Sequence, residues 1–352
     1  MAYYKRLPRT HRQGAMSLAV VSVLGLIVLA VSGVPSAFSS VKTTHAASTH
    51  AATNPCAGKK RYWIYYATHA FPHPFFTPME HGAIAGAKAA CLKVTWTQSP
   101  QGYDLAETVT RMQAAIAQHP DVLVVAVPDP QAEDATIRKA IAAGIKVIEV
   151  NAKDGRPQSQ QPAYLSYVGI TDETQTGIAA ANQILAVNPH PAFAVVANSQ
   201  PGDPELTNRV TGFMQTMKAA GVKTDQVDVH TNTAQALQTY LVAHPQTDAL
   251  YTLSNGSNGS AAARQVIKNL GRTSKIALVS TDYDITDLQA IKAGAQVAAI
   301  DQQQYLQGYL PAVIARLYLD GGQAPTVVST GPGVINKKNV NQVIAQYKKG
   351  NR

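Results

Sequence analysis

The feature that most constrains this fold is an alternation of short apolar runs with amphipathic stretches along most of the chain. After its first residue, the run 121–127 is entirely apolar, as in a parallel strand covered on both faces. Between such runs, apolar residues recur at helical spacing, for example at Leu105, Val109, Met112 and Ile116. This alternation predicts an α/β fold with parallel sheets and right-handed crossovers.

Turn and cap residues mark the limits of these elements. A helix is expected over 78–91, where Thr77 can cap the first turn and Glu80 completes a Thr-x-x-Glu capping box. Another helix is expected to begin after Asp203 and to end at Gly221, a residue free to adopt positive φ. The expected strands are 61–68, 94–98, 121–127, 145–151, 192–198, 249–254, 275–280 and 296–300.

The chain length and a local repeat favour two lobes. A chain of 352 residues suits about two domains. Residues 117–121 place a His-Pro pair and Asp121 before one buried strand, and residues 243–248 place a His-Pro pair and Asp248 before another. The repeat favours two similarly wound lobes over one large sheet, although His-Pro is common enough for coincidence. Ligands of open α/β sheets bind outside the carboxyl ends of the strands.

The first 58 residues have the composition of a targeting region. The chain carries a formal charge of +9, and five basic residues before Cys56 supply much of it, in a stretch without Asp or Glu. A basic segment, an apolar run over 15–31 and small residues at 37–39 predict that 1–39 is an export signal, or alternatively a membrane anchor. Residues 40–58 are expected to form a flexible tether.

Several functional classes find no support in the sequence. The remainder of the chain has a charge of only about +4 and no basic run with interleaved aromatic residues, which argues against nucleic-acid binding. No phosphate-binding glycine loop, nucleophile elbow or zinc-ligand spacing occurs. We therefore expect no catalytic residues, no metal and no cofactor. The sequence favours a binding protein over an enzyme.

Polar and aromatic residues follow the expected strands. Strand-to-helix loops often carry such residues as caps, but aromatic faces combined with carboxylates and amides suit a ligand that presents both ring faces and hydroxyls. The candidate ligand-binding residues are His73, Phe75, Phe76, Asp129, Asn151, Arg209, Ser254, Asn255, Asp282 and Gln302.

Several of these residues belong to motifs of one family. Residues 74–76 read Pro-Phe-Phe, 209–213 read Arg-Val-Thr-Gly-Phe, 281–282 read Thr-Asp, and 299–302 read Ala-Ile-Asp-Gln. Together with 300–311 and 330–333, they resemble the periplasmic ribose-type sugar-binding proteins of ABC importers, which are related to the ligand-binding cores of LacI-type repressors. The resemblance covers about 59–338.

The resemblance implies a type I periplasmic binding protein fold. Two doubly wound parallel-sheet lobes would be joined by a three-crossover hinge. The first lobe would hold 59–170 and 303–329, and the second 171–302 and 330–352. The protein would bind a sugar or polyol by hinge closure, without catalysis, and would deliver it as a monomer to an ABC permease. An extracellular sensor and an enzyme on the same scaffold are the alternatives.

The resemblance also assigns roles to single residues. Phe75 and Phe76 would stack on the sugar, while Arg209 and Asp282 would bind its hydroxyls. Gln302, next to the hinge, would add hydrogen bonds, and Asn151 is expected to do the same from its strand end.

The chain departs from the family pattern at four positions, which makes ribose itself doubtful. Asn151-Ala152 stands in place of an Asp-Arg pair, and Val127 in place of a strand-end asparagine. His73 stands in place of an asparagine, and Thr281 in place of an aromatic residue.

The two cysteines are expected to form a disulfide. Cys56 lies just before the first expected strand, and Cys91 ends the helix that runs back antiparallel to it. Both should therefore reach the same edge of the first lobe, and paired cysteines are common in exported proteins. The alternative is two independent thiols, with Cys91 buried as a small hydrophobic residue.

Overall fold

The computed structural model describes residues 54–68, 76–97, 104–230 and 232–352. The expected export segment, most of the tether, His73 and Phe75 lie outside these ranges. None of the helices within these ranges is both long and apolar enough to cross a membrane.

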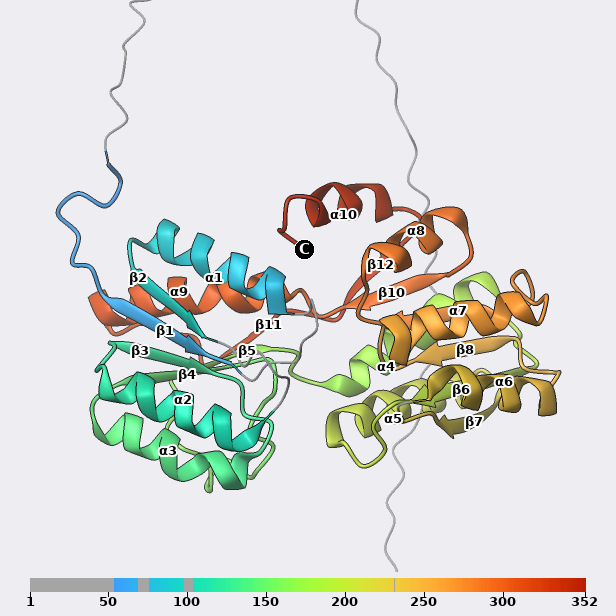
Figure 1. Cartoon of the computed structure of the whole chain (residues 1–352), viewed down its shortest axis with the longest axis horizontal. Coiled ribbons are helices and arrows are strands. Elements are labelled where there is room, and N and C mark those ends of the chain that lie inside the picture. The colour runs from blue at the N-terminus through green and yellow to red at the C-terminus, as the bar shows by residue number, and fades with distance from the viewer. Residues whose placement is uncertain (1–53, 69–75, 98–103, 231) are drawn as a thin grey trace, which may run out of the picture. The chain divides into compact units, whose positions relative to one another are not determined.

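Two six-stranded sheets organise the described residues (Figure 1). The first has the order β11-β5-β4-β3-β1-β2, and all its neighbouring strands are parallel. The second has the order β12-β10-β9-β8-β6-β7, in which β12 pairs antiparallel with β10. The strands are β1 (Trp63–Ala67), β2 (Lys93–Thr97), β3 (Val122–Val125), β4 (Lys146–Val150), β5 (Ser166–Gly169), β6 (Phe193–Asn198), β7 (Lys223–Asp228), β8 (Ala249–Thr252), β9 (Ala277–Thr281), β10 (Ala298–Asp301), β11 (Val327–Ser329) and β12 (Gly333–Asn336).

Helices pack on the sheets and define two lobes. We call the first sheet with its helices the first lobe, and the second sheet with its helices the second lobe. The first lobe has α1 (Phe76–Ala90), α2 (Leu105–Ala117), α3 (Pro130–Ala142) and α9 (Gln304–Gly321). The second has α4 (Glu173–Val187), α5 (Pro204–Ala219), α6 (Thr233–Ala243), α7 (Ser260–Asn269), α8 (Ile285–Ala293) and α10 (Val340–Tyr347), with a short 3₁₀ turn at Gly256–Asn258.

Burial on both faces explains the continuous apolar strands. In β3, Val122 and Val124 belong to the core beneath α1 and α9, whereas Leu123 and Val125 belong to the core on the α2 and α3 side. All four side chains are fully buried. The α/β fold with two parallel-dominated sheets is confirmed.

The two lobes repeat one another at the start of their third strands. Asp121 accepts a hydrogen bond from the backbone N–H of Trp63 at 2.7 Å, where β1 begins. Asp248 accepts one from the backbone N–H of Phe193 at 3.2 Å, where β6 begins. The sequence repeat therefore marks equivalent positions in two similarly wound lobes.

Glycines bring one helix pair of each lobe into close contact. A Cβ added at Gly82 or Gly308 would lie 2.0 or 1.9 Å from a carbonyl oxygen across the α1–α9 contact. At Gly212 and Gly177, the same distances of 2.0 and 1.9 Å occur across the α5–α4 contact. Only glycine permits these approaches, so the two pairs cross at equivalent points.

The predicted start of α1 is wrong. The helix already includes Phe76, so Thr77 lies inside its first turn and cannot form the capping box with Glu80. Phe76 is 2% exposed and packs in the first-lobe core. Pro78 is tolerated because the first N–H groups of a helix have no intrahelical partner.

A disulfide joins Cys56 to Cys91, in the pairing expected from the sequence. The Cα atoms lie 5.4 Å apart, and Cys91 directly follows α1 with only 4% of its surface exposed. The bond ties the segment before β1 to the end of α1.

Candidate functional site

Corresponding strands of the two lobes end in polar residues with the same unusual backbone conformation. Asn151 follows β4 with φ of 59°, and Asp282 follows β9 with φ of 59°. Residues other than glycine seldom adopt this left-handed conformation, and Asn and Asp tolerate it best. Such conformations concentrate at functional sites, where they orient particular side chains.

Gln302 connects these two strand ends. Its Nε2 donates to both carboxylate oxygens of Asp282, at 3.0 and 3.1 Å. Its Oε1 accepts a long hydrogen bond of 3.5 Å from Nδ2 of Asn151. Gln304 also donates to Asp282, at 3.2 Å. The second-lobe carboxylate and the first-lobe amide are thus held by one side chain that directly follows β10.

Gln307 ties this contact to the chain crossings between the sheets. The chain crosses after β5, after β10 and after β11. Gln307 is fully buried, and its Nε2 donates to the carbonyl of Gln302 at 3.0 Å and to Oγ1 of Thr330 at 3.2 Å. Its Oε1 accepts from Asn151 at 3.3 Å. Thr330 itself donates to the carbonyl of Gln302 at 2.9 Å, which joins the second and third crossings.

Tyr167 connects the first crossing to the same group. Its hydroxyl contacts the carbonyl of Asn151 at 2.8 Å and the carbonyl of Ile170 at 2.9 Å. Each of the three crossings is therefore connected to Asn151 or Gln307 by no more than two hydrogen bonds. Sequence reasoning missed Gln307, although its position within the run 302–307 next to a hinge was a usable signal.

Arg209 forms a buried ion pair with a residue that sequence reasoning also missed. Its Nε and Nη2 donate to the two carboxylate oxygens of Glu173 at 2.8 and 2.7 Å. Arg209 is 4% exposed and Glu173 is 8% exposed. Burial by itself lowers the pKa of Arg209, but the charge of Glu173 and its hydrogen bonds outweigh this effect and raise the pKa above its ordinary value.

Two further carboxyl groups interact electrostatically with this ion pair. Burial raises the pKa of Asp282 to about 7, against the opposing effects of Arg209 and of the hydrogen bond from Gln302. The Asp282 residue is partly exposed, but the neighbouring protein atoms keep its carboxylate poorly solvated, and this desolvation raises its pKa. Burial also raises the pKa of Glu205, on α5, to about 7, and the charge of Glu173 adds to this effect. The carboxyl groups of Glu173, Asp282 and Glu205 thus all interact with the guanidinium of Arg209.

The remaining predicted residues have local contacts. Ser254 donates to the carbonyl of Asn258 at 2.9 Å, and its neighbour Asn255 is 6% exposed. Asp129 caps α3 by accepting from the N–H of Ala132 at 3.1 Å. Phe76 packs in the first-lobe core, as described above.

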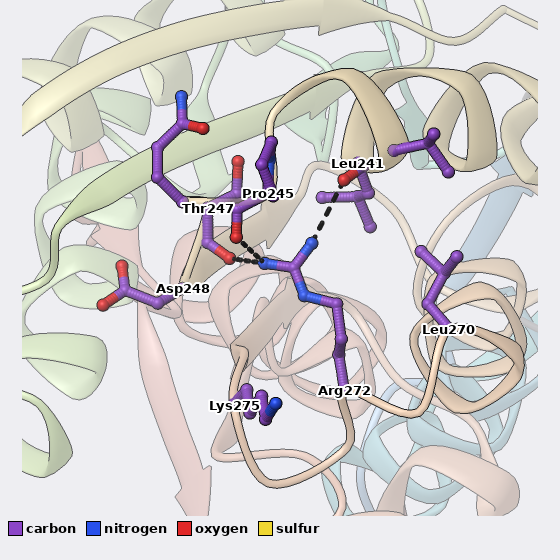
Figure 2. Close-up of a pocket in the computed structure, with 9 residues that line it drawn as sticks. Leu241, Pro245, Thr247, Asp248, Leu270, Arg272 and Lys275 are labelled. Carbon is purple, nitrogen blue, oxygen red and sulfur yellow. Dashed lines mark hydrogen bonds between the residues drawn. The ribbon is translucent and has the colours of Figure 1, made fainter.

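A separate pocket of about 440 Å³ lies beside the end of α6 and the start of β8 (Figure 2). Arg272 crosses it and donates to the carbonyls of Leu241 at 3.2 Å and Pro245 at 2.9 Å, and also to that of Thr247. These bonds hold the turn after α6. None of the predicted site residues lines this pocket. Within the described ranges, no group of His, Cys, Asp and Glu side chains is arranged to hold a metal ion.

The fold and the strand-end residues define a two-lobed α/β binding protein. Residues 64–323, about three quarters of the chain, match the family described as periplasmic binding protein domain. The chain belongs to this family, so the resemblance seen in its motifs is confirmed. The family consists of binding proteins, and membership implies an extracytoplasmic location.

Individual relatives agree with this assignment. The xylose/arabinose-binding protein XylF of Sulfolobus acidocaldarius is 28% identical over 293 residues, covering 79% of this chain and 71% of that protein. A carbohydrate transporter from Acidothermus cellulolyticus 11B, solved with myo-inositol, is 26% identical with a TM-score of 0.68 and covers 83% of this chain and 100% of that one. A periplasmic ribose ABC transporter from Conexibacter woesei shares the fold, with a TM-score of 0.71, 22% identity and coverage of 83% and 98%.

Proposed function

We propose that this protein captures a small sugar or polyol outside the cytoplasm by hinge closure and delivers it, as a monomer, to an ABC permease. The observation that carries the proposal is the pair of equivalent strand-end residues, Asn151 and Asp282, held by the hinge residue Gln302. The relatives named as sugar-binding or ABC transporter proteins support a sugar ligand and favour import over sensing. Segment 1–39 would export the chain or anchor it to the membrane.

The binding groups come from both lobes. Asn151 contributes from the first lobe, Asp282 and Arg209 from the second, and Gln302 from the hinge. His73, Phe75, Phe76, Asp129, Ser254 and Asn255 complete the proposed set. Carboxylate and amide groups pair well with hydroxyls, which both donate and accept hydrogen bonds.

Closure follows from differential binding. A ligand that contacts both lobes binds the closed form more tightly than the open form, and so shifts the population toward closure. No covalent bond is made or broken. The convergence of the three crossings near Gln307 supports a hinge directly beside the proposed ligand-binding groups.

A panel of neutral sugars tests the proposal. Thermal unfolding should be measured with D-xylose, L-arabinose, D-ribose and myo-inositol. A ligand present at 100 times its dissociation constant should stabilise the protein by about 2.7 kcal/mol. Calorimetry with the best ligand should then show that Asp282→Ala weakens binding by about 2 to 5 kcal/mol, because it leaves buried polar partners unpaired.

Asp320→Ala is the matched control, because its carboxylate is 46% exposed and pairs with Arg316 on the surface of α9. This variant should bind like the parent protein. Unchanged affinity in Asp282→Ala, with an intact circular dichroism spectrum, would place the site elsewhere.

A further inference from the structure

We propose that Glu173 sets the charge selectivity of the site, so that it accepts neutral sugars and rejects ligands that carry a carboxylate or a phosphate. The carboxylate of Glu173 takes the position on the guanidinium of Arg209 that a ligand carboxylate would otherwise occupy. The inference rests on the proposed function and names the class of ligand that the same site takes.

The geometry of the ion pair is that of anion recognition. Arginine binds carboxylates and phosphates best through two parallel N–H···O bonds. In this protein both bonds are made to Glu173, by Nε at 2.8 Å and by Nη2 at 2.7 Å. Glu173 leaves the N–H groups of Nη1 and the second N–H of Nη2 free for hydroxyls, while its negative charge offsets the positive charge that would attract an anion. A ligand carboxylate would have to displace Glu173 to obtain the same contact.

Displacement is opposed by the way Glu173 is held. It is the first residue of α4, and Gly177 on the next turn packs against the carbonyl oxygen of Arg209 where α4 meets α5. Thr176 is fully buried and donates a further hydrogen bond of 2.8 Å to Oε2 of Glu173. Only 9% of the Glu173 side chain and 5% of the Arg209 side chain are exposed. Moving Glu173 would leave a buried carboxylate without its partner, which is strongly unfavourable.

The charges around the pair add to the rejection of anions. Asp282 and Glu205 both interact electrostatically with Glu173 and Arg209. On the first-lobe side, Lys153 is an exposed cation near this cluster, with its Nζ 5.5 Å from the ring centre of Tyr167. Even with Asp282 and Glu205 only partly ionised near pH 7, the group formed by Arg209, Glu173, Asp282 and Glu205 has no net positive charge, so it offers an anionic ligand no electrostatic attraction.

Calorimetric titration of matched sugars provides the test. The neutral probe is D-xylose or L-arabinose, and the acidic probe is D-glucuronate or D-galacturonate. The parent protein should bind at least one neutral probe and show no measurable uronate binding. In Glu173→Gln, uronate binding should become measurable, and the affinity ratio of uronate to neutral sugar should rise at least tenfold above the parent's upper limit, because the guanidinium loses its neutralising carboxylate while the side chain keeps its size.

Two controls separate charge from packing. Thr176→Val removes a hydrogen bond from Glu173 but keeps its charge, so the affinity ratio should stay that of the parent. Glu173→Gln combined with Arg209→Gln should lose the uronate binding gained by the single variant. A ratio that does not rise in Glu173→Gln, or that survives the loss of Arg209, overturns the inference.

The parent protein decides the question even if the variants fold poorly. Uronate binding as tight as neutral-sugar binding would overturn the inference while leaving the proposed function intact. Failure to bind any sugar of the panel would instead count against the proposed function.

Discussion

Replacing Gln307 with methionine should lower the free energy of unfolding by about 2 kcal/mol and should weaken ligand binding. Gln307 is fully buried and contacts Gln302, Thr330 and Asn151, which belong to two of the three crossings and to the end of β4. Methionine has a similar length and volume, so the change removes hydrogen bonds without leaving a large cavity.

The magnitude follows from the partners that remain. Gln307 makes three hydrogen bonds, and a typical one contributes about 0.5 to 1.5 kcal/mol net, so the loss lies between about 1.5 and 4.5 kcal/mol. The carbonyl of Gln302 keeps its bond from Thr330, and Asn151 keeps its contact with Gln302. Because each of these partners keeps another hydrogen bond, we expect the loss of stability to lie in the lower part of this range.

Urea denaturation followed by fluorescence measures the effect, and calorimetry with the best sugar measures binding. Gln265→Met is the matched control, because Gln265 is exposed on α7 and bonds to its neighbour Asn269 at 2.7 Å. It should change the free energy of unfolding by less than about 0.5 kcal/mol. If Gln307→Met changed stability no more than this control, the convergence of the crossings on Gln307 would not contribute to stability.

Two further predictions concern stability. Replacing Cys56 and Cys91 with serine should cost about 3.8 kcal/mol, because the disulfide closes a loop of 35 residues, and sugar binding should persist; a loss below about 1 kcal/mol in urea denaturation would contradict the chain-entropy argument. Burial raises the pKa of Glu133 from 4.5 to about 8, so its protonated form stabilises the folded protein at low pH, and this contribution is lost as the pH rises from about 4.5 to 8. Glu133→Gln should remove that part of the decline, as measured by unfolding between pH 5 and pH 9, and an unchanged slope would refute the assignment.

Local sequence patterns determined most of the architecture. The apolar run 121–127 predicted a strand buried on both faces, because such a strand has no solvent side to alternate with. Four strands, β5, β7, β11 and β12, were not predicted. Strand β7 has polar residues at most positions and lies at a sheet edge, and β5, β11 and β12 have only three or four residues each. None of the four carries a periodic apolar signal. The start of α1 was misplaced because the Thr77–Glu80 cap pattern is local, whereas the packing of Phe76 in the first-lobe core is a tertiary contact that local sequence does not report.

The sequence by itself also placed Asn151 and Asp282 at strand ends, since the carboxyl end of a parallel strand is a local property. Only the tertiary structure decided which groups meet there. Glu173 and Arg209 are 36 residues apart, and their pairing depends on the close crossing of α4 and α5 at glycine. Asn151 and Gln307 are 156 residues apart, and they meet because the chain crosses three times at one place. Periodicity and caps act within a few residues, whereas these contacts arise from packing between distant segments.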